Sequence, residues 1–212
     1  MELRLSIDSK GINKASAWLA KVEKQLPFAA SRALNDSAKK AAAALNQSTN
    51  QYFDRPTRFT QSGYRVSSFS NKKTLEAQLR PKPIQERYLL PSITGGIRPQ
   101  RPSERKLGGI APAWSPGLDA RRNASGNMSK AAVVKALQGG GNNFRIKNQQ
   151  GNLRPGVYQR MKRGAVKSIL SFNRLPSIPK RWPVERIALA SLNASWAPLL
   201  NKYMEEALRT AK

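Results

Sequence analysis

Residues 27–45 read PFAASRALNDSAKKAAAAL, and this stretch predicts the helix on which the fold is built. Its apolar positions recur at spacings of three and four, which places them on one face of a helix: Ala30, Leu34, Ala38, Ala41 and Leu45. Pro27 suits the first turn of a helix, so we expect a helix to begin there. The alanine-rich face allows close packing against another helix, of this chain or of a second subunit. Ordinary helix propensity on a surface explains it equally well.

The flanking segments predict a strand and another helix before this stretch, and a break after it. Leu3, Leu5 and Ile7 alternate with polar residues, as in a half-buried strand. Residues 12–26 predict a separate helix with an apolar stripe formed by Ala15, Trp18, Leu19 and Val22. Asp54-Arg55-Pro56-Thr57 is expected to end the helical region.

The next segment predicts a β-hairpin and a short helix. Residues 64–68 and 75–79 alternate as two antiparallel strands, joined by the polar turn 70–73. A helix is expected over 84–93, ending at Gly95-Gly96.

From Arg98 to Ile146 the composition is typical of loops, rich in Pro, Gly and Ser. One helix is predicted there, over 129–137 with Ser129 as its cap, and residues 139–143 form a flexible glycine tip. A loop region of this length is usually functional or ordered by a partner.

The C-terminal part predicts two more strands and a long helix. Val157-Tyr158 and residues 165–172 are expected to close the sheet, and three prolines (Pro176, Pro179, Pro183) to form an extended linker. A last helix begins near Pro183, with an apolar face of Leu189, Leu192, Trp196, Leu199, Tyr203 and Ala207. Pro198 should kink or divide it.

These elements predict an α+β fold: a small antiparallel sheet packed with long N-terminal and C-terminal helices, and a long central loop region. We expect one structural domain over 1–212. It comprises a helix-rich and hairpin part (1–97), an extended loop region (98–146), and a part with strands and the C-terminal helix (147–212).

Composition excludes several classes of function. The 212 residues hold 38 Lys+Arg against 12 Asp+Glu, a formal net charge of +26, with no His and no Cys. Disulfides, thiolate metal sites, zinc sites and Ser-His-Asp or Cys-His catalysis are therefore ruled out. A basic surface that merely aids solubility is a weaker explanation than a polyanionic or acidic partner, because so large a charge causes self-repulsion.

The charge is concentrated in one part of the chain. Residues 120–184 hold fourteen Lys/Arg and no Asp or Glu, so these cations have no counter-charge in the same segment. Nine of them are candidate contacts to phosphate or to an acidic partner: Arg121, Arg122, Arg145, Lys147, Arg154, Arg160, Lys162, Arg163 and Lys167. The aromatic residues among them indicate base stacking only weakly, and Tyr158 and Phe172 fit core-facing strand positions better.

Catalytic and cofactor motifs are absent from the sequence. Neither Gly95-Gly96 nor Gly139–Gly141 is followed by Lys-Ser/Thr, so neither is a phosphate-binding P-loop. Four acids, Asp54, Glu86, Glu104 and Asp119, could converge on a metal as in a nuclease. A helix cap, a turn or a pairing with a nearby arginine is the more ordinary role. We therefore expect no enzyme activity, no metal and no cofactor.

No apolar segment approaches the roughly 18 residues needed to span a bilayer, and the N-terminus lacks the pattern of a signal peptide. We expect no membrane association and synthesis in the cytoplasm, where an assembly containing the protein would form.

Several stretches resemble the tail-completion and neck proteins of tailed phages, the group that includes lambda minor tail protein Z, and especially a prophage branch. The matching stretches are Phe28–Leu45 with Ala33-Leu34-Asn35, Phe53–Thr60 (with Arg58 where proline is more usual), Tyr88–Arg98 with Glu104 following, Leu118-Asp119 with Gly126-Asn127-Met128, and Gly156–Arg160.

The resemblance covers most of the chain and implies a structural protein of the virion. It implies a homo-oligomeric ring, of six or twelve copies, that joins the head to the tail around the DNA channel. The implied partners are the portal or head-completion proteins, the tail terminator or tube proteins, and duplex DNA bound without sequence preference. The alternatives from other classes are a free, non-sequence-specific nucleic-acid-binding protein and a metal nuclease.

Overall fold

The computed structural model describes residues 9–105 and 111–210, with side chains described from residue 16 onward. The predicted strand over residues 3–7 lies outside these residues. The fold is α+β as predicted, with long N-terminal and C-terminal helices packed together and small antiparallel sheets formed by the part of the chain that connects them. The chain divides into two compact units: unit 1 holds the described residues up to Ser48, Ser62–Lys82 and those from Val184 onward, and unit 2 holds Thr49–Gln61 and Pro83–Pro183.

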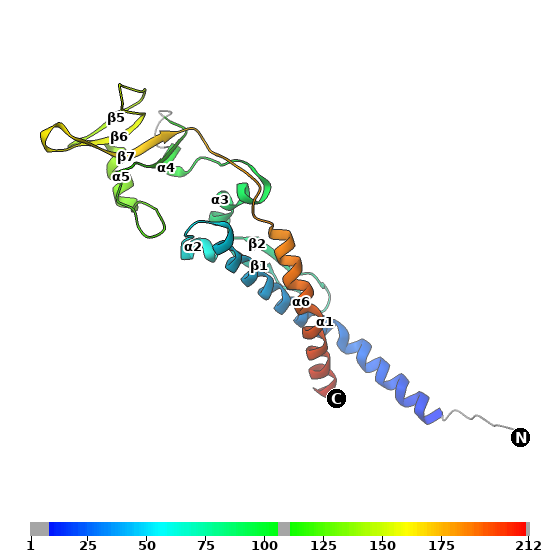
Figure 1. Ribbon diagram of the computed structural model, residues 1–212. Helices are drawn as coiled ribbons and strands as arrows, with labels where there is room; N and C mark the ends of the chain where they lie inside the picture. Colours follow the sequence, from blue (N-terminus) through cyan, green and yellow to red (C-terminus); the bar gives the residue numbers. More distant parts are fainter. Residues whose placement is uncertain (1–8, 106–110, 211–212) are drawn as a thin grey trace, which may run out of the picture. The chain divides into compact units, whose positions relative to one another are not determined.

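Unit 1 is built on two helices that lie side by side, α1 (Ser9–Tyr52) and α6 (Val184–Thr210) (Figure 1). The prediction that Pro27 begins a second helix is wrong, because α1 runs through it without a break. Proline's fixed φ fits a helix, so Pro27 removes one backbone hydrogen bond and crowds the preceding turn but does not force an end. For the same reason α6 is not divided at Pro198.

The alanine-rich face of α1 is buried except at Leu34, which is half-buried, and Ala29 and Ala33 beside it are buried as well. Ala29, Ala33 and Tyr203 form a core cluster against which Trp196 and Leu199 of α6 pack. Two polar contacts lie beside this cluster. The Tyr203 hydroxyl donates to Asp36, and the Arg32 guanidinium lies 4.1 Å from the centre of the Tyr203 ring. The predicted apolar face of α6 is confirmed at Trp196, Leu199, Tyr203 and Ala207 and is wrong at Leu189, which is 51% exposed.

The predicted hairpin is present as β1 (Tyr64–Ser68) and β2 (Gln78–Pro81), the second strand starting three residues later than expected. Two asparagines of α1 form hydrogen bonds to the backbone of this hairpin segment. The amide of Asn46 accepts from the Tyr64 N–H at 2.8 Å and donates to its carbonyl at 3.0 Å, and Asn35 makes the same pair of bonds with Ser70. The hairpin is a separate two-stranded sheet, so the prediction of one shared sheet is wrong.

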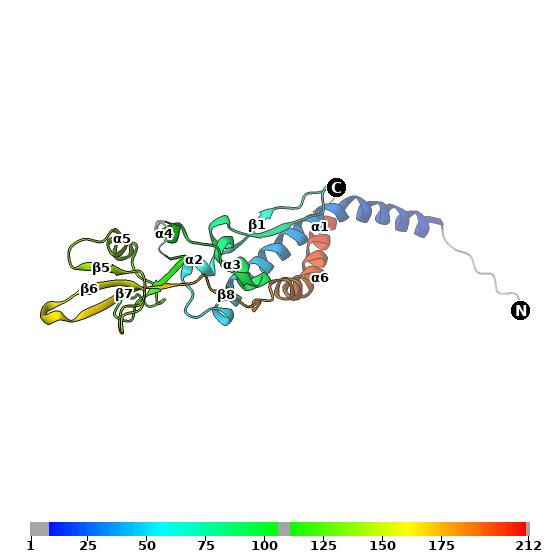
Figure 2. The ribbon, with the colours of Figure 1, turned by 90° about the horizontal axis from the view of Figure 1, so that it is seen from above.

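Unit 2 contains a four-stranded antiparallel sheet. Its order is β4 (Ala113–Pro116), β7 (Val166–Asn173), β6 (Gly156–Arg160) and β5 (Asn143–Ile146). Strands β6 and β7 confirm the prediction, whereas β4 and β5 lie in the region expected to be loop. The predicted helix is α5 (Lys130–Gln138), where the Ser129 hydroxyl accepts from the Ala132 N–H as N-cap. Its Val133 and Ala136 pack on Trp114, Val157 and Leu170 of the sheet, and Figure 2 shows it beside the strands.

Short elements complete unit 2. They are α2 (Arg58–Gln61), α3 (Pro83–Thr94), α4 (Pro102–Arg105), the 3₁₀ turn η1 (Lys162–Gly164), and the strand pair β3 (Gly96–Ile97) and β8 (Ser177–Ile178). The break after α1 and the helix before Gly95 are as predicted. The proline segment is anchored at Trp182, which is fully buried and meets the Phe53 ring edge-on at 5.3 Å. Within the described ranges, no helix has the length and apolar character of a membrane span.

Candidate phosphate-contact surface

All nine cations predicted to contact phosphate lie in unit 2, and every one of them is exposed. None takes part in the salt bridges found among the described residues, which involve Arg32, Lys39, Arg55, Arg98 and Lys202 instead. Their charge is therefore not neutralised within the described chain. The structure sorts the nine into two groups at opposite ends of the sheet.

In the first group, four cations flank the turn between β6 and β7 and two lie on the chain that runs beside β7. We call all six the hairpin group: Arg160, Lys162, Arg163 and Lys167 at the turn, and Arg121 and Arg122 beside the strand. Arg160 ends β6 opposite Val166, and Lys167 lies opposite Gln159. The turn is closed by a 2.8 Å hydrogen bond from the Met161 N–H to the Ala165 carbonyl. Arg163 occupies the left-handed region (φ 64°), which a residue with a Cβ rarely adopts.

Arg121 and Arg122 join this group because the chain after β4 runs along β7. The Asp119 N–H donates to the Ser168 carbonyl at 3.1 Å, and the Ser168 N–H donates to the Asp119 carboxylate at 2.8 Å. The Arg122 guanidinium donates to the Gly117 carbonyl at 2.7 Å, which orders its position beside the strand. Asp119 therefore serves the backbone of the sheet and pairs with none of the six cations in the described structure.

Arg160 also lies over an aromatic pair. Its guanidinium is 5.1 Å from the centre of the Phe144 ring, and Phe144 stacks on Tyr158 with 5.8 Å between ring centres. Tyr158 is buried and its hydroxyl donates to the Arg154 carbonyl, so the prediction of a core-facing position is confirmed. The half-buried Phe144 supports the extended position of Arg160.

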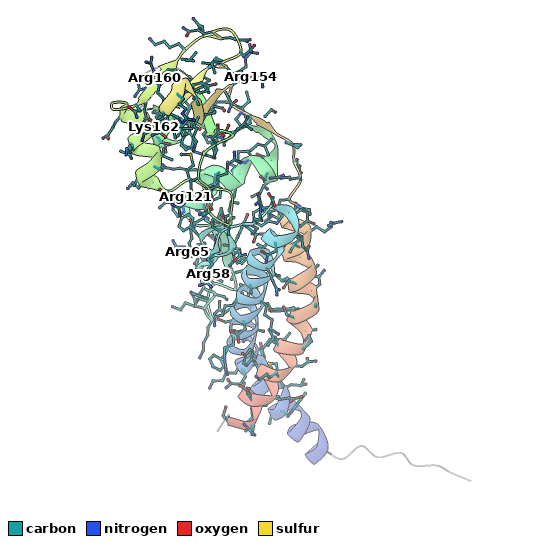
Figure 3. The ribbon with its side chains drawn as sticks, turned by 60° about the vertical axis from the view of Figure 1, so that its left-hand side comes forward. Arg58, Arg65, Arg121, Arg154, Arg160 and Lys162 are labelled. Carbon is teal, nitrogen blue, oxygen red and sulfur yellow. The ribbon has the colours of Figure 1, made fainter. Side chains whose placement is uncertain are left out.

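The second group, which we call the loop group, consists of Arg145, Lys147 and Arg154. Arg145 is on β5, and the other two lie in the connection from β5 to β6. The five residues of β6 separate this connection from the hairpin turn by about 17 Å, at about 3.3 Å per residue. Figure 3 labels Arg160 and Lys162 near each other and Arg154 apart from them.

The acidic residues of unit 2 lie in separate places in the described structure. Glu104 is fully buried and makes a two-pronged ion pair with Arg98, at 2.8 and 2.9 Å, while its carboxylate accepts from the Arg101 N–H at 2.6 Å. Burial alone raises the pKa of Glu104, but the hydrogen bonds from Arg98 and Arg101 outweigh it and lower the pKa below its ordinary value. Asp54 pairs with Arg55. Among the described residues no three acidic side chains gather as metal ligands.

One groove of unit 2, with a volume of about 830 Å³, lies between α4, β4 and α5. Its walls are mainly apolar, and its cations are Arg101 and Lys130, neither of which is among the nine. The indole N–H of Trp114, at the edge of this groove, is buried without a hydrogen-bond partner in the described structure. The candidate surface is therefore separate from this groove.

Comparisons of this chain with protein-family models, with curated proteins and with solved structures find no match. The function must accordingly be argued from the geometry and from the sequence resemblance alone.

Proposed function

We propose that this protein is a structural, non-enzymatic subunit of a tailed-phage virion. In this proposal it is a ring-forming neck or tail-completion protein that contacts the DNA backbone where head and tail join. The observation that carries the proposal is the set of exposed cations without salt-bridge partners on unit 2. The resemblance of the sequence to neck proteins supplies the setting.

The distribution of charge supports a polyanionic partner on this unit. Residues 49–61 and 83–183 contain 21 Lys/Arg against four Asp/Glu, and one of those acids, Glu104, is already buried in an ion pair. Most of this positive charge has no counter-charge in the unit, and duplex DNA or an acidic protein surface is its natural complement.

The spacing of the two groups allows both to contact phosphates of one DNA strand at the same time. The groups lie about 17 Å apart, while a DNA strand presents one phosphate per about 3.4 Å of helix axis, so they would contact positions about five phosphates apart. No α-helix of the described structure carries these cations as a recognition element, since they lie on strands, the 3₁₀ turn η1 and loops. Binding of this kind carries no sequence information.

The conformation of Arg163 supports the same role. Glycine is the default residue at a left-handed position, and an arginine there costs about 1 kcal/mol or more. Retention of a cation at such a position, at the exposed tip of a hairpin, is explained if the charge is used.

The test is the salt dependence of binding to duplex DNA. Replacing Arg160, Lys162 and Arg163 together by Gln should reduce the slope of log K against log [salt] by about two to three, because each lost phosphate contact releases about 0.9 counterion less. Two duplexes of unrelated sequence should give the same slope.

The matched control removes three exposed cations from unit 1, by Arg65→Gln, Lys73→Gln and Arg80→Gln. This control has the same loss of net charge and should leave the slope unchanged. Equal slopes for wild type and the hairpin triple variant would reject DNA contact and indicate that these residues face an acidic protein.

The virion setting needs its own test. Mass spectrometry of purified virions should find the protein, and images of the neck should place it at the junction. If the protein is absent from virions yet binds DNA as above, it is a free, non-sequence-specific nucleic-acid-binding protein, the alternative to the neck role.

A further inference from the structure

The N-terminal part of α1 carries an apolar stripe that the described chain does not cover. Trp18, Leu19 and Leu26 are 56%, 59% and 45% exposed, and Val22 is half-buried between them. We call these four residues the N-terminal stripe. Such a cluster of large apolar side chains on one helix segment is a sign of an interaction surface.

The stripe is the continuation of an interface that already exists. Trp18, Val22 and Leu26 follow one another at four-residue steps, and Ala29 and Ala33 extend the row by three and four. Ala29 and Ala33 are fully buried in the cluster with Tyr203 of α6. The same face of α1 is therefore covered by α6 from Ala29 onward and bare before it.

The bare part extends beyond the covering helix. Both ribbon views show the blue start of α1 running past the red end of α6 (Figures 1 and 2). An unsupported helix of this kind is marginal in water, because most helical stability in proteins comes from packing of an apolar face. A partner that supplies this packing would stabilise it.

Charge permits that partner to be another copy. Over residues 16–28 the helix carries Lys21, Lys24 and Glu23, a net charge of +1 within a chain of +26. Two copies can meet here without the repulsion that other surfaces would impose. A two-fold contact also offers each stripe a surface with the same length and the same exposed apolar area.

We propose that the N-terminal stripe pairs with the same stripe of a second copy, with the two helices antiparallel. Antiparallel pairing keeps the highly charged remainders of the two copies at opposite ends, and it aligns the helix dipoles favourably. A two-fold contact does not close a ring, so this surface is distinct from the ring contacts and the DNA contacts of the proposed function.

Sedimentation of the full chain tests the pairing. At about 300 mM salt, where charge repulsion is screened, the wild type should be a dimer at tens of micromolar. The double variant Trp18→Ser/Leu26→Ser should dissociate at least about a hundredfold more readily, because the dimer loses four apolar side chains, each worth roughly threefold or more. Ala20→Ser, on the opposite face of the helix, should leave the dissociation constant unchanged.

The absence of native cysteine allows a second test by cross-linking. Val22→Cys should form a disulfide-linked dimer under mild oxidation, and Ala20→Cys should not. This readout does not depend on the stability of the serine variants. Val22→Cys and Ala20→Cys should both keep the wild-type slope of log K against log [salt] for DNA binding. This separates failure of this inference from failure of the proposed function.

Three outcomes would overturn the inference. One is a wild type that stays monomeric up to about 100 µM under these conditions. Another is equal cross-linking at positions 20 and 22. The third is a monomer that sediments with vesicles of 70% phosphatidylcholine and 30% phosphatidylglycerol through the stripe, which would make a lipid surface the occupant.

Discussion

At the scale of single residues, the Arg98–Glu104 pair is the most constrained feature of unit 2. Both side chains are buried, with 8% and 0% of their surfaces exposed, and each carboxylate oxygen accepts a guanidinium N–H. Removing one member of a buried ion pair is far more costly than removing both, because it leaves an uncompensated charge.

Glu104→Gln should therefore destabilise the protein at pH 7 by about 3–5 kcal/mol, measured by urea unfolding. Glu86→Gln, at an exposed acid of the same unit, is the control and should change stability by less than about 0.5 kcal/mol. Arg98→Met/Glu104→Leu should recover most of the loss. Equal effects of the two Glu→Gln changes would contradict a structural role for the pair.

The pH dependence follows from the same pair. Because the folded protein lowers the pKa of Glu104 below its ordinary value of 4.5, the contribution of the pair is fully present above pH 4.5 and is lost as the pH falls through the folded-state pKa. The wild type should lose stability below pH 4.5 more steeply than Glu104→Gln does. Urea midpoints measured between pH 5 and pH 3 test this, and parallel curves would refute it.

Arg163 permits a separation of stability from binding. Arg163→Gly removes the left-handed strain but adds chain entropy to the unfolded state, so the unfolding free energy should stay within about 1 kcal/mol of the wild type. Its salt slope for DNA should fall by about 0.9. Arg163→Gln should give the same slope as Arg163→Gly, because both remove the charge. Lys135→Gln on α5 should keep the wild-type slope. A large loss of stability with an unchanged slope would show that Arg163 is structural.

At the scale of elements, the close approach of β6 and β7 depends on a missing side chain. A Cβ at Gly156 would lie 2.3 Å from the Leu170 carbonyl oxygen, a backbone atom that cannot turn away. The same is true at Gly117, where a Cβ would meet the Ser168 carbonyl at 2.3 Å. The positions of β4 and β6 against β7 are therefore set by glycine.

Gly156→Ala should destabilise the protein by about 2–3 kcal/mol, since it forces the two strands apart. Gly164→Ala is the comparison, because its Cβ would meet nothing within 4 Å and only the positive φ of 80° is unfavourable. It should cost about 1 kcal/mol. Thermal or urea unfolding compares them, and a smaller loss at Gly156 than at Gly164 would be inconsistent with this packing.

The elements with strong local patterns could be predicted from the sequence. The hairpin, α3, α5, β6, β7, the end of α1 and the start of α6 all follow from periodicity, caps or prolines near them. Strands β4 and β5 could not, because each has four residues and is defined by its partner; Ala113 pairs with Asn173, sixty residues away. Pro27 misled the prediction because its φ suits a helix interior as well as a start.

The candidate surface was predicted in composition but not in arrangement. The segment that holds the nine cations contains no acidic residue, so their exposure could be predicted from the sequence. Their division into a hairpin group and a loop group depends on the register of β5, β6 and β7, including the irregularity between Val157 and Tyr158. The Arg98–Glu104 pair fits the expectation that an isolated acid pairs with a nearby arginine, but nothing local indicated that both would be buried.

At the scale of the whole molecule, the proposed DNA contacts should be separable from assembly. In virions, the Arg160, Lys162 and Arg163 triple Gln variant should impair retention or delivery of DNA more than it impairs tail joining. Counting joined particles by electron microscopy and packaged genomes by quantitative PCR measures the two effects. An excess of unjoined heads and tails with normal genome content would instead assign these residues to a protein contact.

Unit 1 is discontinuous along the chain, and this has a consequence during synthesis. Unit 2 ends at Pro183, but α6, which packs against Ala29 and Ala33 of α1, begins only at Val184. As the chain leaves the ribosome, unit 2 can complete its contacts while α6 has not yet been made. Until its final segment emerges, the nascent protein therefore exposes the surface of α1 around Ala29 and Ala33. Translation halted before Val184 should leave a fragment that chaperones bind and proteases remove.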